Sequence, residues 1–423
     1  MDERSDAVLS PVKSPETMNK FIQDAEATLR QLQGSLGEVL DAIHEHDGRA
    51  FSLARQLHID KKLAWRIVKV VQSTDPFAAT QYVPGAAAFK MFLSAAQGVG
   101  APVSAIESAL DAFSGFETLV RVHAGDRTSL EMMLTACAKT DRRTVDLVHR
   151  RMAYRGNSFI WGVQVRTYIK CGIVQPCNHD PNKLDLVSVH AFKSLRKLCD
   201  SGRLTIARMM SSEYDTEGRR IFTYEAVSPS SHSCNGLFLL ESFCTHPIPS
   251  IEMLESDRGF LNYELSGSGV GDTAAIDFVE AYAVRGLAAR YRDMHNHYGE
   301  NCANICIPTE SVIIDMLIRE DTFGEINFES IVYGENLRRT FYPSPNRVRD
   351  QLDICEPTSY LGRGTSVLHV PRVPKYPKLV GHVLNELGWD AGRFDVYRCV
   401  LDYPVVPSTI VLRHELPEAP HRQ

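Results

Sequence analysis

The chain has 423 residues, 44% of them hydrophobic, and a formal net charge of -6 at pH 7. This length is enough to bury the cores of two or three domains. The acidic balance argues against a protein that coats nucleic acid or membrane with its whole surface. Any contact with DNA must therefore come from a local basic patch.

No apolar run approaches the roughly 20 residues of a membrane span. The N-terminal stretch MDERSDAVLSPVKSPE is polar and acidic rather than signal-like. We therefore expect a cytoplasmic protein with no membrane contact. The 10 cysteines are scattered, and Cys137 and Cys399 lie in apolar strings, which favours reduced thiols over a disulfide framework.

Helical periodicity dominates the first 170 residues, and Gly and Pro residues separate the periodic stretches. A polar N-terminal tail over residues 1–15 is expected to be disordered. The predicted helices cover residues 16–33, 36–46, 51–57, 61–72, 86–96, 102–123, 129–139 and 142–154.

The pattern changes near residues 172–185, after which short runs alternate or are rich in β-formers. The predicted strands cover 203–210, 219–227, 236–244, 259–265, 303–307, 366–370, 394–403 and 408–416, and helices are expected at 273–293 and 378–387. The fold class is therefore α+β, with a mainly α-helical N-terminal half that contains a helix-turn-helix, followed by a mixed α+β domain. The expected division is a helix-turn-helix region at 16–80, a helical domain at 81–171 and an α+β domain at 185–423.

The stretch LARQLHIDKKLAWRIVKVV, residues 53–71, has the spacing of two helices joined by a tight turn. Ala54 is small enough for the two helices to approach closely. His58 occupies the turn position where Gly is commonest, and Ile59 fills the corner. Asp60 is placed to cap the second helix through its side chain. This arrangement is that of a helix-turn-helix.

The second helix turns its apolar residues to a core and leaves a basic outer face. Cationic side chains in this segment outnumber acidic ones, so the segment can supply phosphate contacts and electrostatic steering. The candidate DNA-binding residues are Arg49, Arg55, Lys61, Lys62, Trp65, Arg66 and Lys69.

This segment resembles the helix-turn-helix of bacterial regulators of the MarR and IclR type, in which patterns such as LAxxLxIxxxxAxRIVxxL are common. The resemblance covers roughly 40 residues, and such patterns also occur in helical proteins that do not bind DNA. It implies a DNA-binding regulator that acts as a homodimer. The alternative is an amphipathic helical pair with a solvated basic face.

The segments VPGAAAFKMFLSAA, RVHAGDRTSLEMML and RRMAYRGNSFIWGVQVR resemble an uncharacterised family of bacterial proteins associated with planctomycetes. Members pair a helix-turn-helix-like N-terminus with a less recognisable C-terminal region. The resemblance implies no reaction, ligand or site residue.

A second basic cluster lies between residues 139 and 170. A charged helical face that packs on the acidic C-terminal domain, or a solvated face, explains this cluster better than DNA contact does. The apolar stretch FIWGV, with Trp161, is expected to lie in a core where the two domains meet. The cationic members of the cluster are Lys139, Arg142, Arg143, Arg150, Arg151, Arg155, Arg166 and Lys170.

Motifs for catalysis and metal binding are weak. The segment GSGVGD at 267–272 precedes a predicted helix but lacks the third Gly of a dinucleotide fingerprint and the Lys-Ser/Thr pair of a P-loop, so a capping loop is favoured. His295, His297, Cys302 and Cys306 offer potential zinc ligands without the spacing of a zinc motif. We predict no catalytic residue, metal ligand or cofactor. The acids Glu310, Asp315 and Glu320 are assigned to a solvated helical face.

Two functions follow from these observations. The first is a DNA-binding transcriptional regulator whose C-terminal domain senses a small-molecule effector or mediates assembly. The second is an interaction or assembly protein whose helix-turn-helix does not bind DNA. For either function we expect a homodimer through the helix at 16–33, where Met18, Phe21, Ile22, Ala25, Leu29 and Leu32 form an apolar face.

Overall fold

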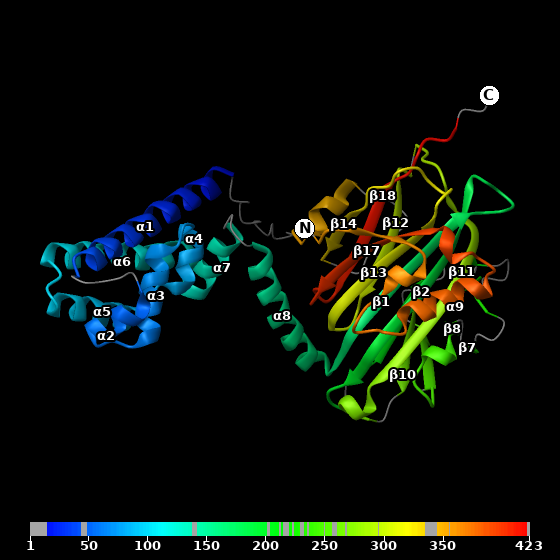
Figure 1. Cartoon of the computed structure of the whole chain (residues 1–423), viewed down its shortest axis with the longest axis horizontal. Coiled ribbons are helices and arrows are strands. Elements are labelled where there is room, and N and C mark those ends of the chain that lie inside the picture. Colours follow the sequence, from blue (N-terminus) through cyan, green and yellow to red (C-terminus); the bar gives the residue numbers. More distant parts are fainter. Residues whose placement is uncertain are drawn as a thin grey trace, which may run out of the picture. The chain divides into compact units, whose positions relative to one another are not determined.

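The computed structural model divides into two compact units, Met1–Asp146 (unit 1) and Leu147–Gln423 (unit 2) (Figure 1). The expected disordered tail lies outside the described residues, apart from residue 15. The structure describes residues 15–420 except 44–48, 138–141, 201–203, 211–212, 215–219, 222–223, 229–231, 235–236, 249, 256–259, 267–268, 295, 335–344 and 355.

Unit 1 is helical, as the periodicity predicts. Its elements are α1 (Pro15–Asp41), α2 (Ala50–Leu57), α3 (Lys61–Gln72), α4 (Pro76–Ala79), the 3-10 turn η1 (Thr80–Tyr82), α5 (Ala86–Gly98), α6 (Val103–Leu119), the π turn η2 (Val120–Ala124) and α7 (Arg127–Cys137).

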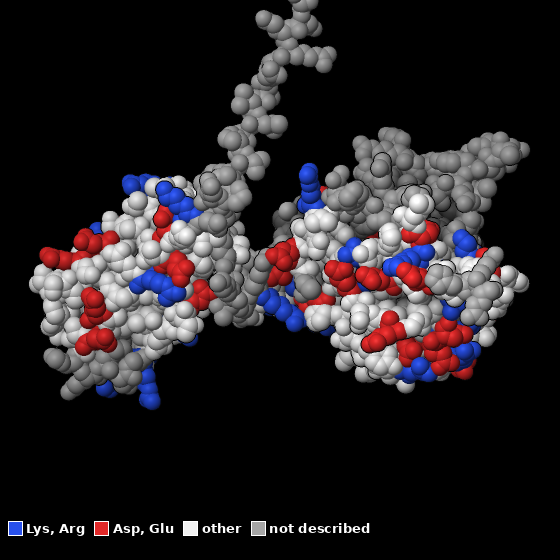
Figure 2. Space-filling model, turned by 90° about the horizontal axis from the view of Figure 1, so that it is seen from above, with Lys and Arg blue, Asp and Glu red and all other residues white. Residues whose placement is uncertain are grey.

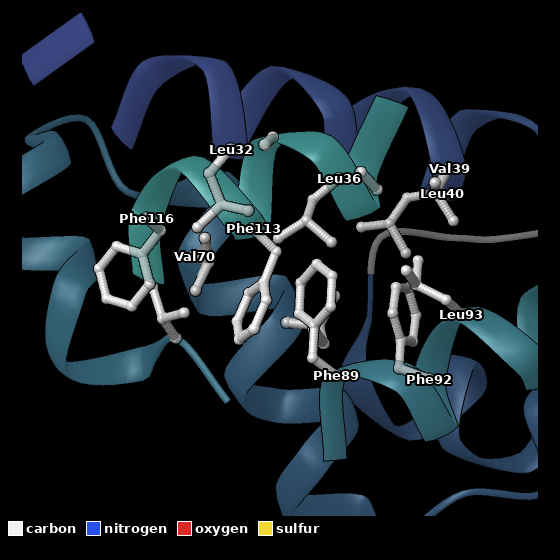
Figure 3. Close-up of a cluster of buried hydrophobic side chains, with 14 of the residues drawn as sticks. Leu32, Leu36, Val39, Leu40, Val70, Phe89, Phe92, Leu93, Phe113 and Phe116 are labelled. Carbon is white, nitrogen blue, oxygen red and sulfur yellow. The ribbon is translucent and has the colours of Figure 1, made fainter. Parts of the chain in front are cut away.

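A single hydrophobic core runs through unit 1 and joins the regions that the sequence suggested were separate at residue 80. Figure 3 shows side chains of α1, α3, α5 and α6 that meet in this core. Phe89 stacks on Phe113 with ring centroids 4.2 Å apart. Leu32 and Leu36 of α1 are fully buried. Burial of this apolar surface is the main stabilising term for the unit.

The helix α1 is continuous through Gly34, where the sequence predicted a break. Its apolar stripe keeps helical spacing across the glycine, and packing on α6 outweighs the helix-propensity cost of about 1 kcal/mol. Phe21, Ala25, Leu29 and Leu32 are all buried within the chain's own core. The face assigned to a dimer interface is therefore already occupied, and that assignment is wrong.

The helix α8 (Arg142–Trp161) extends further than predicted and ends directly before Gly162, whose φ is +65°. The side chains of Phe159, Ile160 and Trp161 are 85%, 77% and 51% exposed. Within unit 2 the stretch FIWGV is split, because Phe159, Ile160 and Trp161 lie on the surface at the end of α8, whereas Val163 is buried in a core at the start of the next strand.

Unit 2 is built on a nine-stranded sheet in the order β16-β17-β13-β1-β2-β11-β8-β7, with β6 paired to β11. β1 and β13 are parallel, while β1 and β2 are antiparallel neighbours. Its strands are β1 (Val163–Pro176), β2 (Lys183–Lys197), β6 (Glu225–Ala226), β7 (His232–Cys234), β8 (Leu237–Leu239), β11 (Ile276–Ala289), β13 (Thr309–Arg319), β16 (Ser359–Arg363) and β17 (Phe394–Asp402).

Smaller sheets complete unit 2. Their strands are β3 (Leu204–Met210), β9 (Ser250–Glu255) and β10 (Phe260–Ser266) in one sheet, β12 (Tyr298–Ile305), β14 (Glu329–Tyr333), β15 (Gln351–Leu352) and β18 (Ser408–Glu415) in a second, and β4 (Glu213–Tyr214) with β5 (Arg220–Ile221) in a third.

Both faces of the nine-stranded sheet are covered. On one face its side chains share a core with strands of the first two smaller sheets. On the other they share a core with α9 (Tyr376–Glu386). The sheet is thus the middle layer of unit 2, and its central strands are buried on both sides.

Two central strands were misassigned from sequence. Residues 276–289 form β11 where a helix was predicted, and residues 309–319 form β13 where Glu310, Asp315 and Glu320 were placed on a solvated helix. Since both faces of these strands are buried, their apolar residues do not alternate with polar ones, and the period of two is lost. The predicted strand at 366–370 is the 3-10 turn η6 (Thr365–Leu368).

The boundary between the units also differs from the prediction. The segment at 172–185, where the sequence pattern changes, lies within a hairpin of β1 and β2, whose register runs from Val163 with Lys197 to Pro176 with Leu184. The helical half ends before this hairpin, and the two units divide between Asp146 and Leu147. Among the described residues, no helix combines the length and apolar character needed to cross a membrane.

Replacing Phe113 with Ala should lower the free energy of unfolding of unit 1 by about 3–5 kcal/mol, because the change removes the ring stacked on Phe89 and leaves a cavity. Urea unfolding followed by circular dichroism at the helix band measures this. Met91→Ala, at a side chain that is 58% exposed on α5, is the control and should have little effect. Equal losses for both variants would contradict the assigned core.

Candidate functional site

The pair α2–α3 is joined by a three-residue turn. His58 adopts the left-handed conformation with φ of 52°, which is the role that Gly commonly has there. The Ile59 N–H donates to the Ala54 carbonyl at 3.1 Å. The Asp60 carboxylate accepts from the N–H groups of Lys62 and Leu63 at 2.8 and 3.3 Å, which confirms the predicted cap.

The outer face of α3 is cationic. Lys61, Lys62 and Lys69 are exposed along this helix, and Arg49 and Arg55 are exposed at the start and end of α2. The Lys61 ammonium lies 5.0 Å from the ring centroid of Phe51. In the part of the chain that the structure describes, Lys62, Lys69 and Arg55 form no ion pair. We call Lys61, Lys62 and Lys69 the α3 basic face.

The spacing of Arg66 predicts that it lies with the lysines on the outer face of α3, but its side chain binds a neighbouring segment instead. Its Nε donates to the Tyr82 carbonyl at 3.1 Å, and its Nη2 donates to the carbonyls of Val83 and Gln81 at 3.0 and 3.3 Å. These bonds tie α3 to the segment after α4. Arg66, a candidate DNA-binding residue from sequence, thus uses its guanidinium to hold α3 within unit 1.

Trp65 is 44% exposed and packs edge-on against Tyr82, with ring centroids 5.3 Å apart. The indole thus lies beside the α3 basic face and is held by the same segment that Arg66 binds. Figure 2 shows that Lys and Arg side chains on the viewed side of the molecule are interspersed with Asp and Glu. An interaction with DNA would depend on a small local surface.

The second basic cluster is split between the surface and the interior. Arg150 is 4% exposed and pairs with Glu356 at 3.1 Å, and Lys170 is 6% exposed within β1. The Arg151 guanidinium lies over the ring of Tyr403, 5.8 Å from its centroid. These residues do not form one solvated face. Lys139 lies outside the described residues.

The remaining sequence candidates do not assemble into a metal or phosphate site. Among the described residues no group of three or more His, Cys, Asp and Glu side chains could hold a metal, and His295 lies outside them. The described part of GSGVGD leads into the short turn η4 (Asp272–Ala274) and the strand β11. No α-helix N-terminus follows it, so the phosphate site considered from sequence has no structural basis.

A shallow cleft of about 510 Å³ on unit 2 is lined by Arg166, Ser194, Arg196, Asp272 and Glu310. Arg196 pairs with Asp272. Glu310 pairs with Arg372, which lies outside the lining, at 3.2 Å. Most of the charge in this cleft is therefore compensated within the chain.

A second group of polar side chains lies inside unit 2, on the face of the main sheet that meets the smaller sheets. Lys170 of β1, His190 of β2 and Glu280 of β11 occupy one row across three neighbouring strands. Ser188 lies two residues before His190 on the same face of β2. We call Lys170, Ser188, His190 and Glu280 the sheet cluster.

Hydrogen bonds order the sheet cluster. The Lys170 amine donates to the Ser188 hydroxyl and lies 2.8 Å from His190 Nε2. Ser188 Oγ is 3.0 Å from the same nitrogen, and the Tyr168 hydroxyl is 2.8 Å from His190 Nδ1. Glu280 is 3% exposed, and its Oε2 has no hydrogen-bond partner in the described structure.

Burial shifts the acid-base properties of this cluster. It lowers the pKa of Lys170 to about 8, against the opposing attraction of Glu280. It raises the pKa of Glu280 to about 7, against the attraction of Lys170. Burial, together with the Lys170 charge, holds the pKa of His190 well below its usual range. An amine and a carboxyl thus both titrate close to neutral pH.

Asn301 of β12 closes over the same region. A Cβ on Gly172 would lie 3.0 Å from Asn301 Nδ2 and 2.7 Å from Met316 Sδ, so the glycine leaves room for both side chains. The Asn301 Nδ2 is buried without a partner among the described residues. The sheet cluster therefore has a buried acceptor on one side and a buried donor on the other.

The sheet cluster is not among the sites that the sequence predicts. A signal is present, because three of its four members interrupt an apolar run: Lys170 in YIKCGIV, His190 in VSVHAF and Glu280 in FVEAY. Such interruptions indicate a buried polar residue only when the run is known to be a central strand. Since the pattern of residues 273–293 predicts a helix, it does not place Glu280 beside His190.

No protein-family model matches this chain, and no curated protein matches it significantly.

Replacing Glu280 with Gln should change how stability depends on pH. The pKa of Glu280 is raised in the folded protein, so its protonated form favours folding, and its contribution is lost as the pH rises from about 4.5 through about 7. Relative to Glu280→Gln, the parent should lose about 2–3 kcal/mol of unfolding free energy between pH 5 and pH 8. Urea unfolding at each pH measures this, and parallel pH profiles would contradict it.

Proposed function

We propose that this protein is a DNA-binding regulator that places α3 in the major groove. The observation that carries the proposal is the α3 basic face, presented by a capped helix that follows a tight turn from α2. A helix of this kind fits the width of the major groove, and exposed lysines can contact phosphates on either side of it. The resemblance to MarR- and IclR-type motifs agrees with this assignment.

The contacts that hold α3 in unit 1 also support the proposed DNA binding. Leu63, Ala64 and Ile67 are buried in the unit 1 core, so the helix is held on one side and its lysines project on the other. Arg66 fixes the helix to residues 81–83. A rigidly held helix loses little conformational entropy when it binds. In this proposal unit 2 senses a small-molecule effector or mediates assembly.

Replacing Lys62 and Lys69 together with Ala should weaken DNA binding by about 1–3 kcal/mol per lost contact and reduce the slope of log affinity against log salt by about two. Fluorescence anisotropy with mixed-sequence and genomic duplexes over a salt series measures both. Arg66 is left unchanged, because its loss would disturb the helix.

The matched control is Lys20→Ala with Lys90→Ala, which removes the same charge from exposed positions on α1 and α5. This control should bind DNA as the parent does at every salt concentration. If the α3 variant also binds as the parent does, the regulator proposal fails.

A second candidate function is assembly of copies of this chain, which the surface of α8 favours. Val148 and Met152 are 53% and 62% exposed and share a helix face with Phe159, which is 85% exposed. Antiparallel pairing about a two-fold axis would place Val148 of one copy against Phe159 of the other. Such pairing would cover apolar surface on both copies, and exposed apolar surface of this kind is typical of interaction sites.

Replacing Phe159 and Ile160 together with Ser should raise the dimer dissociation constant about ten-fold or more, because the apolar contact between the copies is removed. Sedimentation equilibrium of the full chain measures the change. Met91→Ser, which alters an exposed methionine of α5, should leave the dimer intact. A parent chain that is monomeric at working concentration would remove this second function.

A further inference from the structure

The sheet cluster combines a buried amine with two neighbours that orient it. The Lys170 ammonium has three N–H donors, and Ser188 and His190 lie within hydrogen-bond distance of it. His190 is held in turn by the Tyr168 hydroxyl at 2.8 Å. The amine is therefore positioned by a chain of hydrogen bonds that runs across two strands.

Glu280 supplies the complementary charge. Its carboxyl lies in the same cross-strand row as Lys170 and His190, and its Oε2 is buried without a hydrogen-bond partner among the described residues. Its negative charge acts on Lys170, and the Lys170 charge acts on it. Glu280 therefore favours a positive charge on the Lys170 nitrogen, and His190 Nε2, 2.8 Å from that nitrogen, is the acceptor for a proton that leaves it.

We propose that Lys170 is a nucleophilic amine that forms an imine with a small carbonyl compound. This activity is separate from the proposed DNA binding and does not depend on it. A desolvated lysine is suited to this chemistry, because burial favours the neutral amine, which is the attacking species. The ligand class is a small aldehyde or 2-oxo acid, whose carbonyl carbon accepts the amine.

The step balances within the cluster. The Lys170 ammonium gives one proton to His190 Nε2, 2.8 Å away, which leaves a neutral amine and an imidazolium. The amine nitrogen bonds to the carbonyl carbon, the carbonyl electron pair moves to oxygen, and a proton passes from nitrogen to that oxygen. The His190 imidazolium then protonates the hydroxyl, the C–O bond breaks and water leaves. The resulting C=N bond carries a protonated nitrogen, whose charge the Glu280 carboxylate favours, and no oxidant or reductant is required.

The acid-base properties support this assignment. Burial lowers the pKa of Lys170 to about 8, so near pH 7.5 a substantial fraction of the amine is neutral. An ordinary lysine, with a pKa of about 10.4, is almost fully protonated there. Lys193 on the same strand as His190 is the natural comparison, because it pairs with the Asp277 carboxylate.

The test is reductive trapping on the full chain. The protein is incubated at pH 7.5 with glyoxylate and sodium cyanoborohydride, which reduces the imine to a stable carboxymethyl-lysine, and the modified peptides are mapped by mass spectrometry over time. Lys170 should be labelled about ten-fold faster than Lys193 or the exposed Lys62. No labelling of Lys170, or labelling no faster than Lys193, overturns the proposal.

Two variants sharpen this result. Lys170→Arg keeps the positive charge but lacks the primary amine, so the fast labelling phase should disappear. Lys193→Arg should retain it. A fast phase that persists in Lys170→Arg assigns the reactivity to another lysine and overturns the proposal. If Lys170→Arg does not fold, the peptide map of the parent and of Lys193→Arg still decides the outcome.

Discussion

The burial of the nine-stranded sheet on both faces is the constraint on which the structure of unit 2 depends. With α9 on one side and two smaller sheets on the other, the central strands have no solvent-exposed face. A polar side chain on these strands must find its partners within the layer, since an unpaired polar group in such a place costs free energy. Asp315 of β13 meets this demand through Arg398 at 2.8 and 2.7 Å and the Tyr376 hydroxyl at 2.7 Å. On the opposite face, Glu280 leaves its Oε2 without a hydrogen-bond partner among the described residues.

In unit 1 the main constraint is on the short helix α3, which is held by the core on one side and exposed on the other. The long apolar stripe of α1 and the aromatic side chains of α5 and α6 form the core on which α3 rests. Arg66 adds a polar attachment at the edge of that core. As a result, a residue that its spacing placed with the lysines of the outer face contributes to the support of the helix. The division between exposed and supporting residues of α3 follows hydrogen bonds that no periodicity reveals.

Local signals made much of unit 1 predictable. The bounds of α2 and α3, the cap at Asp60 and the left-handed turn at His58 all depend on residues within a few positions of each other. The errors arose where a feature depends on distant parts of the chain. β11 and β13 lack alternation because both of their faces are covered, and Gly34 breaks no helix because α6 supports α1. The sheet cluster could not be assembled from sequence, since its members become neighbours only through the pairing of β2 with β1 and β11.

The parallel pairing of β1 with β13 also bears on how the molecule is made. Val165 pairs with Thr309 and Val174 with Ile318, so the centre of the sheet closes only after much of unit 2 has been synthesised. Closing so long a loop costs chain entropy before any contact compensates for it, and folds rich in distant contacts form slowly. The helices of unit 1 are held by contacts between neighbours in sequence to a greater extent, and they precede the sheet on the ribosome. We therefore expect unit 1 to be folded before β13 has been synthesised and paired with β1. During that interval the edge of β1 is unpaired, and chaperone binding or aggregation at this edge would compete with correct folding.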